Sequence, residues 1–102
     1  MLLVNAQQTT MPLKGKVSIP EGVLVRELRG ESVLLNLNTE SYFGLDDVGT
    51  RMWAVLTGSP SVQAAYEILL AEYEVDPARL SADLQGFIQK LDELGLIKLS
   101  DV

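Results

Sequence analysis

The spacing of hydrophobic residues changes once along the chain. Hydrophobic and polar positions tend to alternate between Val23 and Leu45, which is typical of β-strands with one buried face. From Val48 to Leu94 the hydrophobic residues instead recur every third or fourth position, which indicates amphipathic helices. A group of strands followed by a group of helices predicts an α+β fold class.

The first half of the chain predicts three short strands. The first begins at Val17–Ile19, is interrupted by Pro20 and resumes over Val23–Leu28. The second covers residues 32–38 and the third covers Tyr42–Leu45. Because only short turns separate them, we expect an antiparallel sheet in which consecutive strands are neighbours.

Three helices are predicted after the strands, each preceded by a side chain that can cap it. The candidate N-caps, in chain order, are Asp46 or Asp47, Ser59 or Ser61, and Asp76. The third helix is the longest and runs from about Pro77 to Leu94, with proline in its first turn. Gly95 then stands where a residue with positive φ commonly ends a helix, so Leu96 and Ile97 can fold back onto the core.

The 102-residue chain has neither cysteine nor histidine. Their absence excludes disulfides, thiolate nucleophiles, Cys/His zinc sites and imidazole acid–base catalysis. The adjacent acids Asp46 and Asp47 are better interpreted as a helix cap with a charge that suits the helix dipole than as a catalytic pair. We therefore expect a protein that is not an enzyme and that holds no cofactor or metal.

The charge is −6 overall and is unevenly distributed. Residues 1–30 have a net charge of +2, whereas residues 31–102 have a net charge of −8. An acidic body repels phosphate backbones, and the third helix has only two basic side chains, Arg79 and Lys90, against three acidic ones. A winged-helix nucleic-acid binder is therefore disfavoured, although it remains an alternative.

The N-terminal residues 1–16 read as a flexible arm, and residues 17–102 as a single domain. The start of the chain lacks the basic and long apolar regions of a signal peptide. No run of about 18 apolar residues is present, so we expect no membrane span. Together with the absence of cysteine, these features favour a cytoplasmic protein.

The third strand is a candidate peptide-binding edge. Alternation places Tyr42 and Gly44 on one face and Phe43 and Leu45 on the other. The segment contains no charge or proline that would block pairing with another strand, and Gly44 has no side chain to obstruct one. The alternative is a strand that serves only the core.

The third helix offers a matching wall. Leu84, Ile88 and Leu91 form its core-facing stripe, whereas Phe87 lies on a flank with Asp83 and Lys90. This flank either lines a groove or consists of a core phenylalanine beside two solvated charges.

These features occur together in a known family. The chain resembles the PqqD-like family, or RiPP recognition elements, in the segments LLNLNTESYFGLDDVGTRMW, AEYEVDP and LSADLQGFIQKLDELGLI. Each segment alone is weakly specific, but their order and spacing together are more so, and they fall within about residues 17–99. The resemblance implies a winged-helix-like fold with a three-stranded antiparallel sheet followed by three helices.

The resemblance also implies a function. Members bind the leader segment of a ribosomally made precursor peptide, which adds as a strand beside the third strand and packs against the third helix. Carried over to this chain, the peptide-binding residues are Ser41, Tyr42, Phe43, Gly44, Leu45, Asp83, Leu84, Phe87, Ile88, Lys90 and Leu91. We expect apolar pockets beside Tyr42 and Phe87 to determine specificity.

The resemblance favours the lasso-peptide type, in which the domain hands the leader to a separate leader protease. The alternative is pyrroloquinoline quinone biosynthesis, in which the partner is a radical S-adenosylmethionine enzyme. In either case the partners are a leader peptide and a modifying enzyme or protease. An exposed strand edge would also allow two copies to pair as a homodimer.

Overall fold

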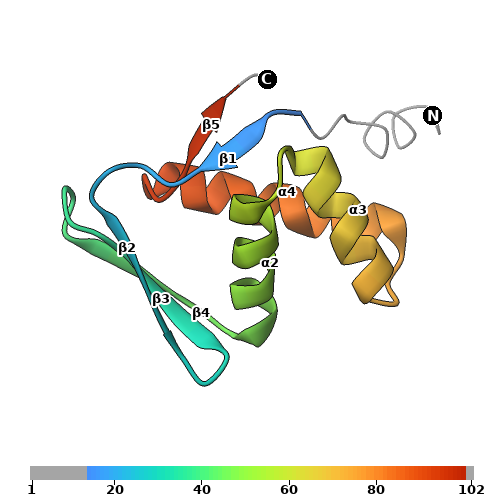
Figure 1. Cartoon of the computed structure of the whole chain (residues 1–102), viewed down its shortest axis with the longest axis horizontal. Coiled ribbons are helices and arrows are strands. Elements are labelled where there is room, and N and C mark those ends of the chain that lie inside the picture. Colours follow the sequence, from blue (N-terminus) through green and yellow to red (C-terminus); the bar gives the residue numbers. More distant parts are fainter. Residues whose placement is uncertain (1–13, 101–102) are drawn as a thin grey trace, which may run out of the picture.

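The computed structural model describes residues 14–100 and contains two small sheets and three helices (Figure 1). Within this range the order of strands and helices confirms the predicted α+β fold, with a three-stranded antiparallel sheet followed by three helices. Most of the predicted arm, residues 1–13, lies outside the described residues, so its role as a separate segment stays a prediction.

The three-stranded sheet consists of β2 (Val23–Leu28), β3 (Glu31–Asn36) and β4 (Ser41–Leu45), in that order. A two-residue turn joins β2 to β3, and both of its residues, Arg29 and Gly30, have positive φ. Such a turn matches the natural twist of the two strands and fixes their register. In that register Val33 lies between Arg26 on β2 and Gly44 on β4.

The first predicted strand is in fact two separate strands. Its initial part forms β1 (Lys16–Ser18), which pairs not with the main sheet but with β5 (Lys98–Ser100). Pro20 and the positive φ of Gly22 separate β1 from β2. The sequence pattern does not indicate β5, because three residues after a helix are too few to show alternation.

The helices begin at the predicted caps. Asp46 caps α2 (Asp47–Gly58) by accepting a hydrogen bond from the backbone N–H of Gly49 at 2.8 Å. Ser61, rather than Ser59, caps α3 (Val62–Glu72), and Asp76 caps α4 (Pro77–Glu93). Each cap satisfies a backbone donor that the helix itself cannot satisfy.

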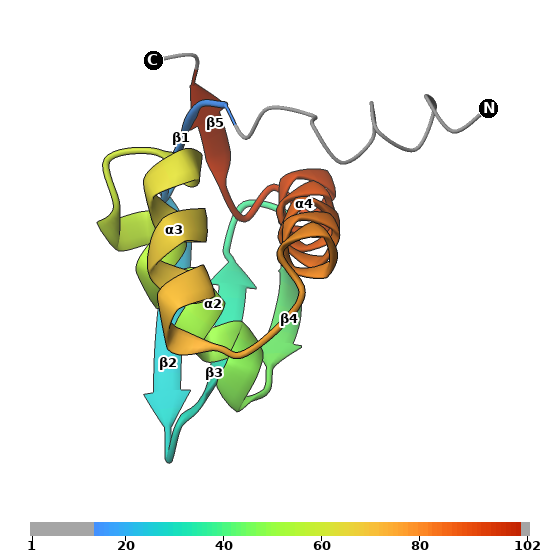
Figure 2. The same ribbon diagram turned by 90° about the vertical axis from the view of Figure 1, so that its right-hand side faces the viewer.

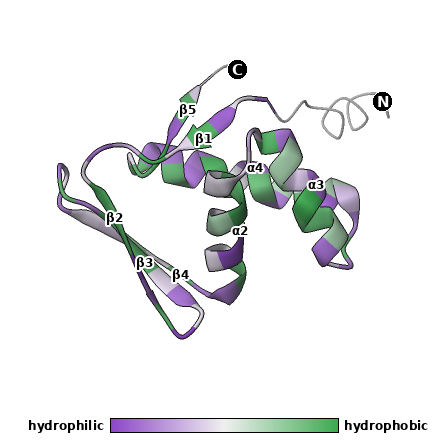
Figure 3. Cartoon of the chain, in the orientation of Figure 1, coloured by the Kyte–Doolittle hydropathy of each residue, from purple (hydrophilic) through white to green (hydrophobic). Residues whose placement is uncertain are grey.

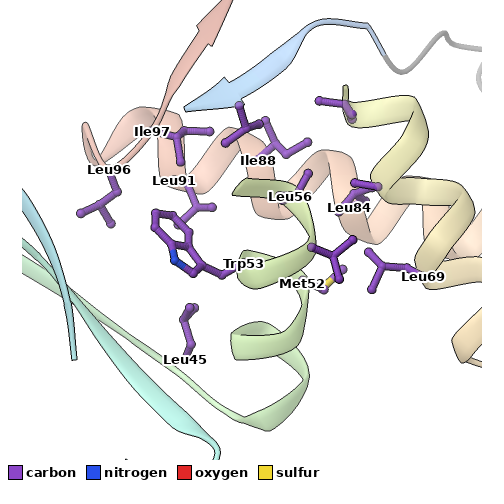
Figure 4. Packing of buried hydrophobic residues seen from close by; sticks show 14 of the residues in the cluster. Leu45, Met52, Trp53, Leu56, Leu69, Leu84, Ile88, Leu91, Leu96 and Ile97 are labelled. Atoms are coloured by element: carbon purple, nitrogen blue, oxygen red, sulfur yellow. The ribbon is translucent and has the colours of Figure 1, made fainter. Parts of the chain in front are cut away.

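The hydrophobic core lies between the helices and one face of the sheet (Figure 4). Trp53 of α2 points from that helix toward Leu91 and Leu96, with Leu45 at the end of β4 on its other side. Leu34, Leu84, Leu91 and Leu96 are completely buried. As predicted, the chain after Gly95, whose φ is 69°, folds back so that Leu96 and Ile97 enter the core.

A buried asparagine connects the sheet to the end of α4. The Asn36 side chain donates hydrogen bonds to the carbonyl oxygens of Leu94, at 3.3 Å, and Gly95, at 2.9 Å. Its own oxygen accepts from the backbone N–H groups of Asn38 and Thr39 in the β3–β4 turn. One side chain therefore holds the start of β4 close to the C-terminal end of α4.

The three helices lie on one side of the three-stranded sheet (Figures 1 and 2). The other face, which we call the outer face, is not covered by any element in residues 14–100. The hydrophobic stretch of β2 is visible in Figure 3. The exposed apolar side chains of the outer face are those of Leu24, Leu28, Val33 and Tyr42.

Candidate functional site: an open strand edge beside a groove

The backbone of β4 has a free side. Within the described residues β4 pairs only with β3, so it is an edge strand. The two-residue turn makes Leu28 and Glu31 a hydrogen-bonded pair, and such pairs alternate along an antiparallel ladder. The hydrogen bond from the Leu37 N–H to the Gly22 oxygen, at 2.9 Å, fits this alternation of bonded and non-bonded pairs.

The same alternation determines which backbone N–H and C=O groups of β4 are free. On β3, Ser32, Leu34 and Asn36 are left to bond with β4, and they lie opposite Leu45, Phe43 and Ser41. Tyr42 and Gly44 therefore direct their N–H and C=O groups away from β3. The open edge offers two donors and two acceptors to an added strand.

A groove of about 1140 Å³ runs along this edge. On one side it is lined by Phe43, Gly44 and Leu45 of β4, and on the other by the exposed flank of α4. Figure 2 views α4 nearly end-on and shows it above β4, with the start of α2 beside them. Because Asn36 holds the elements together at one end, the groove opens toward the other end, where the α3–α4 loop passes.

The flank of α4 combines small, aromatic and charged side chains. Ala82 and Gly86 lie one turn apart, so a peptide can approach the helix backbone closely at this point. Phe87 is half-buried beside them and packs against the core. The polar residues on this wall include Arg79 and Asp83, which form an exposed ion pair at 3.8 Å.

The structure divides the expected peptide-binding residues into three groups. The residues that line the groove are Phe43, Gly44, Leu45, Asp83, Phe87 and Lys90. Those buried beneath it are Leu84, Ile88 and Leu91, which support the wall from the core as their spacing suggested. Those that do not line it are Ser41 and Tyr42.

Tyr42 differs from expectation in its surroundings. Its side chain projects from the outer face, is 74% exposed and does not line the groove. Phe43 is the aromatic residue of β4 that faces the groove, because the alternation of the strand turns it toward the core. Tyr42 contributes its backbone to the edge rather than its ring to the groove.

Several groove residues were not anticipated from the sequence. They come from the start of α2, the end of α3 and the loop that follows, and include Val48, Gly49, Met52, Tyr73, Val75 and Ala82. Val48 and Met52 lie one helical turn apart, and this spacing predicts an amphipathic helix but not that its first turn lines a groove. The loop residues carry no periodic signal, so only the tertiary fold brings them to the groove.

In residues 14–100, no group of three or more acidic side chains is arranged to hold a metal ion. The shifted pKa values in this range belong to an exposed ion pair, Arg51 of α2 with Glu72 of α3, and neither residue lines the groove. Hydrogen bonding to Arg51 holds the pKa of Glu72 below its usual value. None of the helices described here has the length and apolar character that a membrane span requires.

The comparisons with known proteins point to one family. The profile described as "Coenzyme PQQ synthesis protein D (PqqD)" matches residues 31–97. No curated protein sequence matches the chain. Two solved structures are similar over most of their length.

The first is described as TbiB1 in complex with the TbiA(beta) leader peptide. It shares 34% sequence identity with this chain and has a TM-score of 0.74, over 79% of this chain and 94% of that chain. The second is a lasso peptide synthetase B1 complexed with the leader peptide, with 22% identity and a TM-score of 0.72, over 81% of this chain and 98% of that one. The second likeness concerns the fold alone. The family profile and the first structure confirm the predicted resemblance, and the chain belongs to the PqqD-like family.

Proposed function

We propose that this protein is a non-catalytic adaptor that binds the leader segment of a ribosomally made precursor peptide. The leader adds as a fourth strand to β4, and its side chains enter the groove against α4. The observation that carries this proposal is the open edge of β4, because its unpaired N–H and C=O groups face solvent directly beside an apolar groove. The 34%-identical structure, which holds a leader peptide, supports it.

The adaptor presents the bound leader to a separate modifying enzyme or leader protease. We favour the lasso-peptide type, since both similar structures belong to leader complexes and one is described as a lasso peptide synthetase component. The description of the family profile supports the alternative, a peptide chaperone in pyrroloquinoline quinone biosynthesis. We place the protein in the cytoplasm, where precursor peptides are made.

The unpaired edge also allows two copies to pair when no leader is present. In this arrangement the leader and the second copy compete for the Tyr42 and Gly44 backbone groups. Addition of leader should therefore convert any dimer to a monomeric complex in analytical ultracentrifugation.

An NMR titration tests the proposal directly. Labelled protein is titrated with extended peptides that contain Tyr-x-x-Pro, an element that the resemblance to the lasso-peptide type implies for the leader, and separately with the TbiA(beta) leader. We expect shift changes concentrated at residues 42–45 and 83–90. Absence of any change with these peptides, together with changes on addition of duplex DNA, would replace the adaptor with a nucleic-acid binder.

A further inference from the structure

The outer face of the sheet contains a second hollow that adjoins the open edge. It has a volume of about 410 Å³ and lies on the side of the sheet opposite the groove. Its outward-facing residues are Arg26, Leu28, Glu31, Val33 and Gly44, and Asp46 closes it at the end of β4. It exists because Gly44 has no side chain to cover Val33, its neighbour on β3.

Strand addition determines what reaches this hollow. A residue directly opposite Gly44 in the new ladder would direct its side chain to the same face as Gly44, which is the outer face. Its neighbours on either side would point into the groove instead. One leader side chain therefore meets the hollow whichever way the leader runs.

The hollow favours a long side chain with an apolar stem. Val33 is 38% exposed and Leu28 is 74% exposed, so both offer apolar surface for the stem to cover. No atom lies within 4 Å of the position of a Cβ on Gly44, so a stem can lie flat across the glycine. Lysine and arginine bury their stems in this way while their charged heads remain in water.

Distance decides which charged group of the hollow can pair with that side chain. Continuing the register of β3 and β4 by one residue places Asp46 opposite Glu31, and the backbone of Asp46 is still extended. With strands about 4.8 Å apart and a rise of about 3.4 Å per residue, the Cα of Asp46 would lie about 8 Å from that of the leader residue. A lysine or arginine side chain extends about 6–7 Å from its Cα, which is enough to reach the carboxylate.

An acidic leader residue is less well placed than a basic one. Its partner would be Arg26, which lies three strand spacings from the added strand, or about 14 Å between Cα atoms. Glutamate and arginine side chains together extend about 12 Å, so this ion pair would form only with both exposed side chains almost fully extended, which costs side-chain entropy. The electrostatic field of the protein also favours a basic leader residue, because residues 31–102 have a net charge of −8.

We infer that the outer-face hollow is a second specificity subsite, which takes the leader residue opposite Gly44 and selects lysine or arginine there through Asp46. The inference rests on the proposed function, since it requires strand addition to β4. It gives the adaptor contacts on both faces of the sheet: apolar pockets in the groove and one basic side chain on the outer face.

The test uses random 15-residue peptides displayed as a library and selected on the immobilised full chain. Peptides whose binding is lost in Gly44→Pro, which removes an edge donor, are taken as strand adders. Among these we expect lysine or arginine to be enriched at a single position. The best binder is then synthesised with that residue and with glutamine in its place.

Both peptides are measured against two matched variants. Asp46→Asn removes the charge but keeps an efficient N-cap, and Asp47→Asn removes an equal charge from the next residue, which does not line the hollow. We expect the basic peptide to bind Asp46→Asn about two- to fivefold more weakly, as for an exposed ion pair, and the glutamine peptide to be unaffected. Asp47→Asn should have a smaller effect.

Equal losses in the two variants, or no enrichment of a basic residue among strand adders, would overturn the subsite while leaving the adaptor intact. Selected peptides that all bind Gly44→Pro as well as the wild type would overturn strand addition, and the subsite with it.

Discussion

Replacement of Gly44 by proline separates the role of the edge in binding from its role in folding. The N–H of Gly44 points away from β3, so proline removes no bond of the existing sheet. Its φ is not positive, and proline is tolerated on edge strands when the missing N–H faces solvent. Because proline fixes φ near −65°, whereas a strand prefers about −140°, we expect the domain to stay folded with its free energy of unfolding lowered by about 1–3 kcal/mol.

The effect on binding should be much larger. The proline ring occupies the place where the carbonyl of an added strand would approach, so the neighbouring edge bonds of Tyr42 are disturbed as well. Loss of four backbone hydrogen bonds at about 0.5–1.5 kcal/mol each costs about 2–6 kcal/mol. Even the lower value corresponds to about a 30-fold increase in Kd.

Two further variants make the result decisive. Gly44→Ala keeps the N–H, and its Cβ would meet no atom within 4 Å, so folding should be unchanged and binding nearly so. Phe43→Pro removes an N–H directed at β3 together with a ring that packs on the core, so it should unfold the domain. Isothermal titration calorimetry gives Kd, and circular dichroism melting checks the fold. A folded Gly44→Pro protein with a Kd within about threefold of the wild type would refute strand addition to β4.

Other parts of the structure give three more predictions. Lys90→Glu should weaken leader binding more than Lys98→Glu, since only Lys90 lines the groove; equal losses by calorimetry would exclude this wall of α4. Asn36→Ala leaves buried backbone groups without partners and should cost about 2–3 kcal/mol, seen as a melting temperature lower by on the order of 10 °C; an unchanged melt would show that Asn36 is not needed to hold α4. Glu72→Gln removes the ion pair to Arg51: because the folded pKa of Glu72 is lowered from 4.5, its stabilisation is present above that pH and is lost as pH falls through the folded value. The variant should therefore melt slightly lower than the wild type at pH 7 and equally at pH values well below the folded pKa of Glu72, and a difference that persists in strong acid would contradict this assignment.

The sequence was informative where local chemistry determines structure. The caps Asp46 and Asp76, Pro77 in the first turn and Gly95 after the last turn all act within a few residues, so their positions could be predicted. The same holds for alternation in β3 and β4. These elements are enough to predict the order of strands and helices.

Features that depend on distant residues were not predictable in this way. The pairing of β1 with β5 joins residues 80 to 84 positions apart and has no local signal. The contribution of Tyr73 and Val75 to the groove depends on how the α3–α4 loop packs near β4. The orientation of Tyr42 follows from alternation, but whether its ring lies near the groove depends on which face of the sheet the helices cover.

The small sheet of β1 and β5 has a consequence for how this domain can be joined to other proteins. Lys16 lies opposite Ser100 in that sheet, so the chain enters and leaves the folded domain at neighbouring positions. No residue of either strand lines the groove or the outer-face hollow. A fusion partner could therefore be attached at either end, or the whole domain inserted into a loop of a larger enzyme, with nearly the same tether geometry and without covering the peptide site.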